Sequence, residues 1–303
     1  MGRHTSSPEE CKRAVLHFLM ALIPFTKPHA TAAQRVAHLR AKGLIITRPS
    51  VAARKIELIG YERLRIYFLS RRDLTLPNRP FLPGTTYHDI LRLYQCDMEI
   101  RSACFAAVGT FELLFRNAFS EALSHANGSH PYYDHSLFKD AAANLEALRY
   151  FVGVFEKSKD QRARHYKQRY GSPVLPPIWT LKEFLTFGAT SRLYQCLEGS
   201  IRTAIARQFG VASDAIFKDW VECLVDLRNI CAHHDRLFNR RFQKQPPNYR
   251  RGGVPTASVH TLKAILECLD HLLDSAGASA HITNRVERII RRFPEMQLSE
   301  AGY

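Results

Sequence analysis

An arginine and a histidine five residues apart, Arg228 and His233, enclose the short sequence RNICAH, and Asn229 follows the arginine directly. A guanidinium group can hold a phosphate through two parallel donors, and an imidazole can move a proton near neutral pH. Together these groups supply what phosphodiester chemistry needs, namely charge stabilisation and proton transfer. We therefore interpret Arg228, Asn229 and His233 as candidate catalytic residues.

The surrounding stretch, residues 220–240, is predicted to begin as a helix because its apolar residues recur every three or four positions. On such a helix Asn229 and His233 share a face, whereas Arg228 and His233 diverge by about 140°. Arg228 reaches the same place only through its long side chain, or if a second helix closes a groove over both. The residues predicted to face the core are Trp220, Cys223, Leu224, Leu227 and Cys231.

A structural role for the same residues is the alternative interpretation. Arg228 would pair with a carboxylate, for example Asp226 or Asp235. The two histidines would then be surface residues near a helix end, where the helix dipole favours cations.

The cysteines and histidines of this stretch also invite a metal or thiol interpretation. Cys223, Cys231, His233 and His234 lack the close paired spacing of zinc ligands, so we predict neither a metal site nor a cofactor. A Cys231 nucleophile activated by His233 is disfavoured because residues two apart on a helix point to different sides. The sequence has no Gly-rich phosphate loop of the Walker type.

Several phrases of the sequence resemble one known family. RNICAH resembles the Arg-(Asn/Asp/His)-x-x-x-His motif of HEPN ribonucleases, and the longer RNICAHHDRLFNR resembles the end of the Abi-like (abortive infection, AbiD/AbiF type) family. Glu62 stands where family members often carry a second tyrosine. The other family-like phrases are RAKGLII at 40–46, IGYERL at 59–64, FLPGT at 81–85, LYQCDMEIR at 93–101 and PIWTLKEFLTFG at 177–188.

This resemblance implies a phage-defence protein that acts as a metal-independent endoribonuclease. The RNA 2′-OH would attack the adjacent phosphorus, with His233 as general base or acid, Arg228 on the phosphate and Asn229 orienting one of them. DNA, which has no 2′-OH, would not be cleaved. HEPN relatives commonly build the groove from two copies of the motif, and this chain carries one complete copy, so we expect a homodimer.

Another part of the sequence resembles the family's Glu-x-x-x-Arg pattern. Glu112 and Arg116 are four residues apart on a predicted helix, and Asn117 follows. Two interpretations remain open: a structural salt bridge, or a pair that helps to shape an anion site near Arg228.

Further basic residues are candidates for RNA contacts. His234, Arg236 and Arg240 follow the motif and are assigned to the RNA backbone. The basic segment 157–169 could also follow a phosphate backbone while its aromatic residues stack on unpaired bases, although a solvated helix surface is equally open. The residues of this segment assigned to RNA binding are Arg162, Arg164 and Lys167.

The charge balance points to polyanionic partners. Lysine and arginine number 43 against 28 acids, a net charge of +15. We expect RNA as substrate and also consider a regulatory non-coding RNA and a restraining antitoxin. The rival function is a non-catalytic RNA- or DNA-binding protein; its weaker form is a transcriptional regulator that reads DNA through a helix-turn-helix over 36–59.

Cysteine usage and hydropathy suggest a cytoplasmic protein. The seven cysteines are odd in number and form no Cys-x-x-Cys, which is typical of reduced thiols. No apolar run approaches the ~20 residues that span a bilayer. The apolar run 14–25 would fit a signal peptide, but acids precede it and Ser7-Pro8 favours the start of an amphipathic helix.

The elements expected to position these residues are helices, because strand-like alternation is scarce. We predict an all-α fold: a HEPN-like helical bundle with an N-terminal helical extension and C-terminal helices. The expected domains are residues 1–80 and 81–303, or one continuous domain. Trp179 and Phe187 are expected in the core, 71–86 as a loop, and 241–253 as a basic loop that contacts nucleic acid or is disordered. The predicted helices include 51–59, 87–103, 104–126, 145–170, 259–273 and 281–293.

Overall fold

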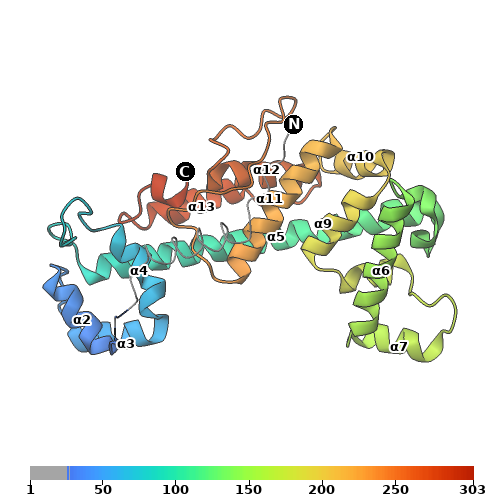
Figure 1. Cartoon of the computed structure of the whole chain (residues 1–303). Coiled ribbons are helices and arrows are strands. Elements are labelled where there is room, and N and C mark those ends of the chain that lie inside the picture. The colour runs from blue at the N-terminus through green and yellow to red at the C-terminus, as the bar shows by residue number, and fades with distance from the viewer. Residues whose placement is uncertain (1–25, 27) are drawn as a thin grey trace, which may run out of the picture. The chain divides into compact units, whose positions relative to one another are not determined.

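The computed structural model describes residue 26 and residues 28–303 (Figure 1). Within these residues it contains helices and isolated β-bridges but no strand, so the all-α prediction is confirmed. The helix predicted to begin at Ser7-Pro8 lies outside the described residues. Two compact units divide the chain, Met1–Tyr87 and His88–Tyr303. Within the described ranges, no helix combines the length and apolar character needed to cross a membrane.

The first unit is a small helical cluster. Thr31 caps its first helix in a capping box, in which Gln34 N donates to Thr31 Oγ1 at 3.3 Å and Thr31 N donates to Gln34 Oε1 at 2.8 Å. The ring of Phe68 lies 6.2 Å from those of both Phe81 and Tyr87, which fixes the predicted loop 71–86 onto the helices. The helices are α2 (Ala32–Ala41), α3 (Pro49–Ile59) and α4 (Tyr61–Leu69).

The second unit is built along α5 (Tyr87–Asn127), a single helix of 41 residues (Figure 1). The sequence predicted two adjoining helices, 87–103 and 104–126, at this place. They are continuous because Ala103-Cys104 contains neither a proline nor a glycine that would interrupt the hydrogen bonding. Ala103 and Cys104 are both buried, so the junction is part of the core.

An aromatic cluster packs the later half of α5 against three neighbouring elements. Phe111 lies 5.2 Å from Phe209, and Phe115 lies 5.7 Å from Tyr194 and from Phe217, as measured between ring centroids. Edge-to-face pairs of this kind add roughly 0.5–1.5 kcal/mol each beyond the burial of their area. The helices joined to α5 in this way are α9 (Phe187–Cys196), α10 (Gly199–Gln208) and α11 (Asp214–Ala232), and α6 (Ala141–Lys157) packs on α9.

Two predictions for residues 145–188 were wrong. The expected helix 145–170 is broken after Lys157, because the side chain of Asp160 accepts a hydrogen bond from Arg162 N and starts a new helix, α7 (Gln161–Arg169). Trp179 is 47 % exposed instead of buried. It lies in the four-residue helix α8 (Ile178–Leu181), whose two terminal residues supply the buried contacts. Phe187 is buried as predicted.

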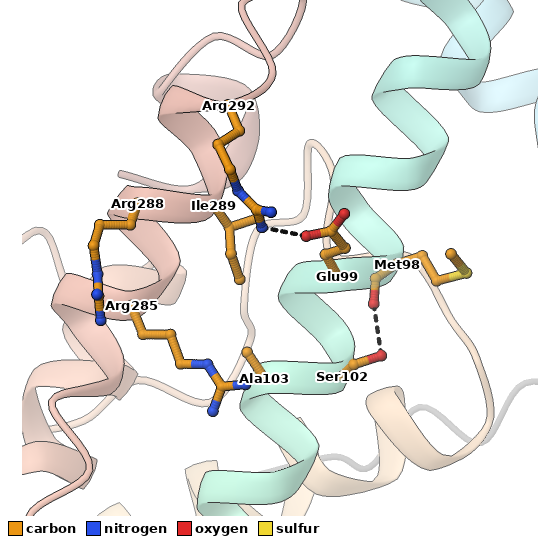
Figure 2. Close-up of a pocket in the computed structure, with 8 residues that line it drawn as sticks. All are labelled: Met98, Glu99, Ser102, Ala103, Arg285, Arg288, Ile289 and Arg292. Carbon is orange, nitrogen blue, oxygen red and sulfur yellow. Dashed lines mark hydrogen bonds and ion pairs between the residues drawn. The ribbon is translucent and has the colours of Figure 1, made fainter.

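The C-terminal part packs on α11 and on the first half of α5. The loop 241–253 lies against α11, because Phe242 and Tyr249 are buried and Trp220 Nε1 donates to Pro247 O at 2.9 Å. It is followed by α12 (Leu262–Ser275) and α13 (Ile282–Arg291). Arg292, directly after α13, pairs with Glu99 of α5 (Figure 2).

A buried carboxylate on α5 fixes the chain that follows α11. The side chain of Asp97 is 1 % exposed and pairs with Arg101, four residues later on the same helix. Its Oδ1 also accepts hydrogen bonds from Leu237 N at 3.0 Å and Phe238 N at 2.9 Å. Asp97 therefore ties the segment after the Arg–His motif to α5.

Replacing Asp97 with asparagine tests this role. Asp97→Asn keeps an oxygen for the two backbone N–H groups but leaves buried Arg101 without its counter-charge. We expect the free energy of unfolding to fall by about 3–5 kcal/mol, measured by urea denaturation of the second unit. Asp219→Asn is the matched control, because Asp219 is 44 % exposed and its pair with Lys218 should contribute less than about 1 kcal/mol. Equal losses in the two variants would contradict the prediction.

Candidate functional site

The Arg–His motif lies at the end of helix α11, whose apolar face is buried in the core. Ser213 caps its first turn, with Oγ accepting from Ile216 N at 3.4 Å. Its predicted core positions, among them Trp220 and Leu227, are no more than 5 % exposed, so this prediction is confirmed. Arg228 is half-buried on the flank of this face, with a side chain 30 % exposed, and Asn229 is exposed.

The carboxylate that contacts Arg228 comes from α5. Arg228 Nε lies 3.5 Å from Glu112 Oε2, and the other oxygen of Glu112 pairs with Arg116. Among the described residues neither Asp226 nor Asp235 pairs with Arg228. The structural interpretation was therefore wrong in the partners that it named. We call Glu112, Arg116 and Arg228 the Glu112 cluster; it places one buried acid between two guanidinium groups.

The Glu112 cluster keeps a net positive charge of +1, from two arginines and one acid. The Nε atoms of Arg116 and Arg228 are buried, and neither has a hydrogen-bond partner within the described chain. An incoming anionic oxygen could therefore reach only the exposed part of the Arg228 side chain, since its Nε faces Glu112. Asn117 is not part of the cluster, because its Oδ1 accepts from Lys182 Nζ at 2.5 Å. Sequence reasoning did not identify Lys182, although it lies in the family-like phrase 177–188.

The two histidines close α11. His234 N donates to Cys231 O at 3.1 Å, and Asp235 N donates to Ile230 O at 2.9 Å, which is the Schellman arrangement. His234 has φ +57°, the left-handed conformation that glycine usually supplies at this position. His233 is the C-cap and its side chain is exposed. No hydrogen bond or ion pair joins Arg228 to His233 in the described part of the chain.

The arginines after the motif stabilise the loop in which they lie. Arg236 Nη1 donates to Phe238 O and, at 2.9 Å, to Asn239 O. Arg240 Nη1 donates to Arg236 O at 3.1 Å. Both guanidinium groups remain only half-buried, so their assignment to the RNA backbone stays a prediction beside this structural role.

Helix α7, which carries the other basic residues assigned to RNA binding, lies apart from α11 (Figure 1). Arg162 pairs with Asp160 at 3.0 Å and with Glu183 at 3.6 Å, and Lys167 Nζ donates to Glu156 O at 2.9 Å. Arg164 is exposed. The structure therefore does not bring these predicted RNA contacts to the Glu112 cluster, and two of the three are engaged with acidic groups or backbone.

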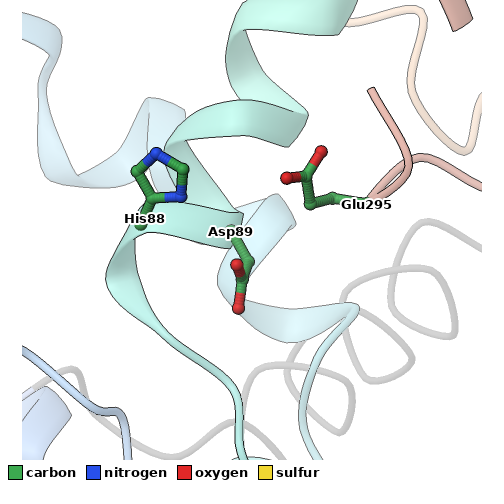
Figure 3. A group of neighbouring side chains, drawn as sticks. All are labelled: His88, Asp89 and Glu295. Carbon is green, nitrogen blue, oxygen red and sulfur yellow. The ribbon is translucent and has the colours of Figure 1, made fainter. Parts of the chain in front are cut away.

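The cysteines near the motif and the residues that could bind a metal ion lie at different places in the structure. Burial raises the pKa of the Cys223 and Cys231 thiols to about 12, so both are protonated at neutral pH. His88, Asp89 and Glu295 form a group whose potential ligand atoms lie within 4.8 Å of one another (Figure 3). Arg92 Nε lies 3.4 Å from Glu295 and already supplies that carboxylate with a positive charge.

The fold and the site define an all-α protein in which the end of one helix carries an Arg–His motif and a buried acid on a second helix holds the arginine. The profile of the family described as Abi-like protein matches residues 54–239, more than half of the chain. The chain belongs to this family, whose membership suggests abortive-infection phage defence. No curated protein matches the chain, and no solved structure does.

Because His234 has the left-handed conformation, we expect the glycine variant to be more stable than the alanine variant at this position, and the opposite at His233. His234→Gly should be more stable than His234→Ala by about 1 kcal/mol, because both lose the imidazole and only alanine keeps the strain of a Cβ at positive φ. At His233, where φ is −85°, alanine should instead be the more stable by roughly 0.5–1 kcal/mol. Chemical denaturation measures all four variants. The same order at both positions would contradict this account.

Proposed function

We propose that this Abi-like protein is a metal-independent endoribonuclease in phage defence, with Arg228, Asn229 and His233 as its catalytic residues. The observation that carries the proposal is the Glu112 cluster. Arg228 pairs with Glu112 while its side chain remains 30 % exposed. An arginine held in this way is pre-organised to receive a phosphate.

The proposed reaction needs only proton transfer and charge stabilisation. The 2′-oxygen forms a bond to phosphorus as its proton passes to a base, and the bond from phosphorus to the 5′-oxygen breaks as that oxygen gains a proton. The products are a 2′,3′-cyclic phosphate and a 5′-OH. His233, exposed at the end of α11, serves as base or acid, and Arg228 stabilises the charge on the non-bridging oxygens.

A homodimer completes this mechanism. One chain offers a single His233, whereas the reaction moves a proton at two different oxygens. Within one α11 helix, Arg228 and His233 also point about 140° apart. A second copy placed across a two-fold axis would supply the other histidine and close a groove over both residues. A regulatory RNA or an antitoxin would restrain such an enzyme until infection.

Cleavage of single-stranded RNA in EDTA tests the proposal. Wild-type protein should cut labelled RNA and leave cyclic-phosphate ends, whereas Arg228→Ala/His233→Ala should lose at least about 100-fold in rate, because charge stabilisation and proton transfer are both removed. Arg207→Ala/His135→Ala, which changes the same residue types at exposed positions, is the matched control and should keep its activity. A DNA strand of the same sequence should remain intact.

The rival function is a non-catalytic protein that holds RNA or DNA on its basic surface. The pairing of Arg228 with Glu112 favours it, because an arginine already neutralised by an acid can have a purely structural role. In the same assay, tight binding by both the wild type and the double variant without cleavage by either would support this rival and refute the ribonuclease.

Glu112 is proposed as a positioning residue for Arg228. Glu112→Gln removes the charge that holds both arginines, so we expect kcat to fall by roughly 10- to 100-fold through misplacement of Arg228. KM should stay constant or decrease, because a negative charge near the RNA is lost. Glu121→Gln, an exposed acid on the same helix, is the control and should leave both parameters unchanged. A raised KM with unchanged kcat would show that Glu112 does not position the catalytic group.

A further inference from the structure

Helix α13 separates its apolar and cationic residues onto opposite sides. Ile282, Val286, Ile289 and Ile290 are buried. The four arginines in and directly after this helix are all exposed. Three of them recur at intervals of three and four positions and therefore share a face: Arg285, Arg288 and Arg292.

This face borders a cleft against the first half of α5, with a volume of about 620 Å³ (Figure 2). We call it the α5–α13 cleft; its lining on the α5 side includes Met98, Glu99, Ser102 and Ala103. The volume falls in the range of about 300–1,000 Å³ that is usual for small-ligand sites. The cleft is therefore large enough for a phosphate group and part of the molecule that carries it.

The charges that face the cleft do not balance. Three arginines and one acid, Glu99, leave a net charge of +2. Glu99 pairs with Arg292, whereas the side chains of Arg285 and Arg288 make no hydrogen bond or ion pair with any described residue. Two guanidinium groups on neighbouring turns of one helix repel each other unless an anion lies between them.

Two acids on α13 and α12 are engaged away from the cleft. Glu287 pairs with Lys263 at 3.1 Å, on the side of α13 away from the cleft. Asp270 accepts hydrogen bonds from Ile282 N at 2.7 Å and Thr283 N at 3.0 Å, where it caps the start of the helix. Among the described residues that line the cleft, Glu99 is the only carboxylate, and it pairs with Arg292.

We propose that the α5–α13 cleft binds phosphate groups, as a site separate from the Arg–His motif. Arginine suits this ligand because its planar fork donates two parallel hydrogen bonds to phosphate oxygens. The ligand must carry at least two negative charges to match the excess in the cleft. A single-stranded RNA backbone and a free di- or polyphosphate both have this chemistry.

The cleft is distinct from the Glu112 cluster in position and in sequence. Ser102 and Glu112 lie about 15 Å apart along α5 and roughly 80° apart around it. Helix α13 also lies beyond residues 54–239, the part of the chain that the family profile matches. Phosphate binding in the cleft goes beyond the proposed cleavage and does not require it.

Binding of two uncleavable probes tests this inference. The first is a fluorescent single-stranded 2′-O-methyl oligonucleotide, which has no free 2′-OH and so reports binding even if the protein has no ribonuclease activity. The second is inorganic pyrophosphate, titrated by calorimetry. The variants are Arg288→Gln and Arg285→Gln/Arg288→Gln. Arg291→Gln is the matched control, because it removes an exposed arginine of the same helix that does not line the cleft.

The double variant should bind at least one probe about 10-fold more weakly than the wild type does. Arg291→Gln should weaken binding of that probe less than about 2-fold. For the oligonucleotide, the dependence of log affinity on log salt should flatten by about 1.4, since each single-strand phosphate contact contributes about 0.7. Loss of the oligonucleotide alone would identify an RNA backbone as ligand, and loss of pyrophosphate alone would identify a free phosphate compound. Unchanged binding of both probes, or equal losses in Arg288→Gln and Arg291→Gln, would overturn the proposal. Circular dichroism confirms that each variant is folded.

Discussion

The arrangement of the candidate site depends on one buried carboxylate. Asp97 loses its hydration inside the second unit, a cost that is offset only because Arg101 and two backbone N–H groups surround it. Those N–H groups belong to Leu237 and Phe238, just beyond the Arg–His motif. Any movement of this segment away from α5 would leave the buried carboxylate without its two backbone donors, so the chain after α11 is held in one place.

The same arrangement of a buried acid and its partners occurs twice along α5. In each case an acid pairs with the arginine four residues later and also receives a third partner from the region of the motif. Asp97 takes the backbone after α11, and Glu112, about four helical turns further on, takes the side chain of Arg228. The contact of Asp97 fixes the position of the end of α11. The contact of Glu112 fixes the orientation of the Arg228 guanidinium group. A long uninterrupted α5 is what keeps these two contacts in a fixed relation.

Local patterns were readable from the sequence, and contacts between distant segments were not. The capping box at Thr31 and the pair of Asp97 with Arg101 follow from spacing within one turn of helix, and the structure contains both. The partner of Arg228 could not be found in this way, because Glu112 lies on another helix and only packing brings the two together. Trp179 shows the converse error: an aromatic residue was assigned to the core by type, although its helix is too short to bury both sides.

The two faces of α13 are free to change in different ways. Its buried isoleucines and valine are fixed by close packing against the second unit, where even one methylene is felt. Its arginines touch little of the protein, since within the described chain only Arg292 among the three that line the cleft has a carboxylate partner. Substitutions on that face can therefore accumulate without disturbing Asp97 or Arg228. A lineage could alter which anion its protein recognises while leaving the motif and its supports as they are.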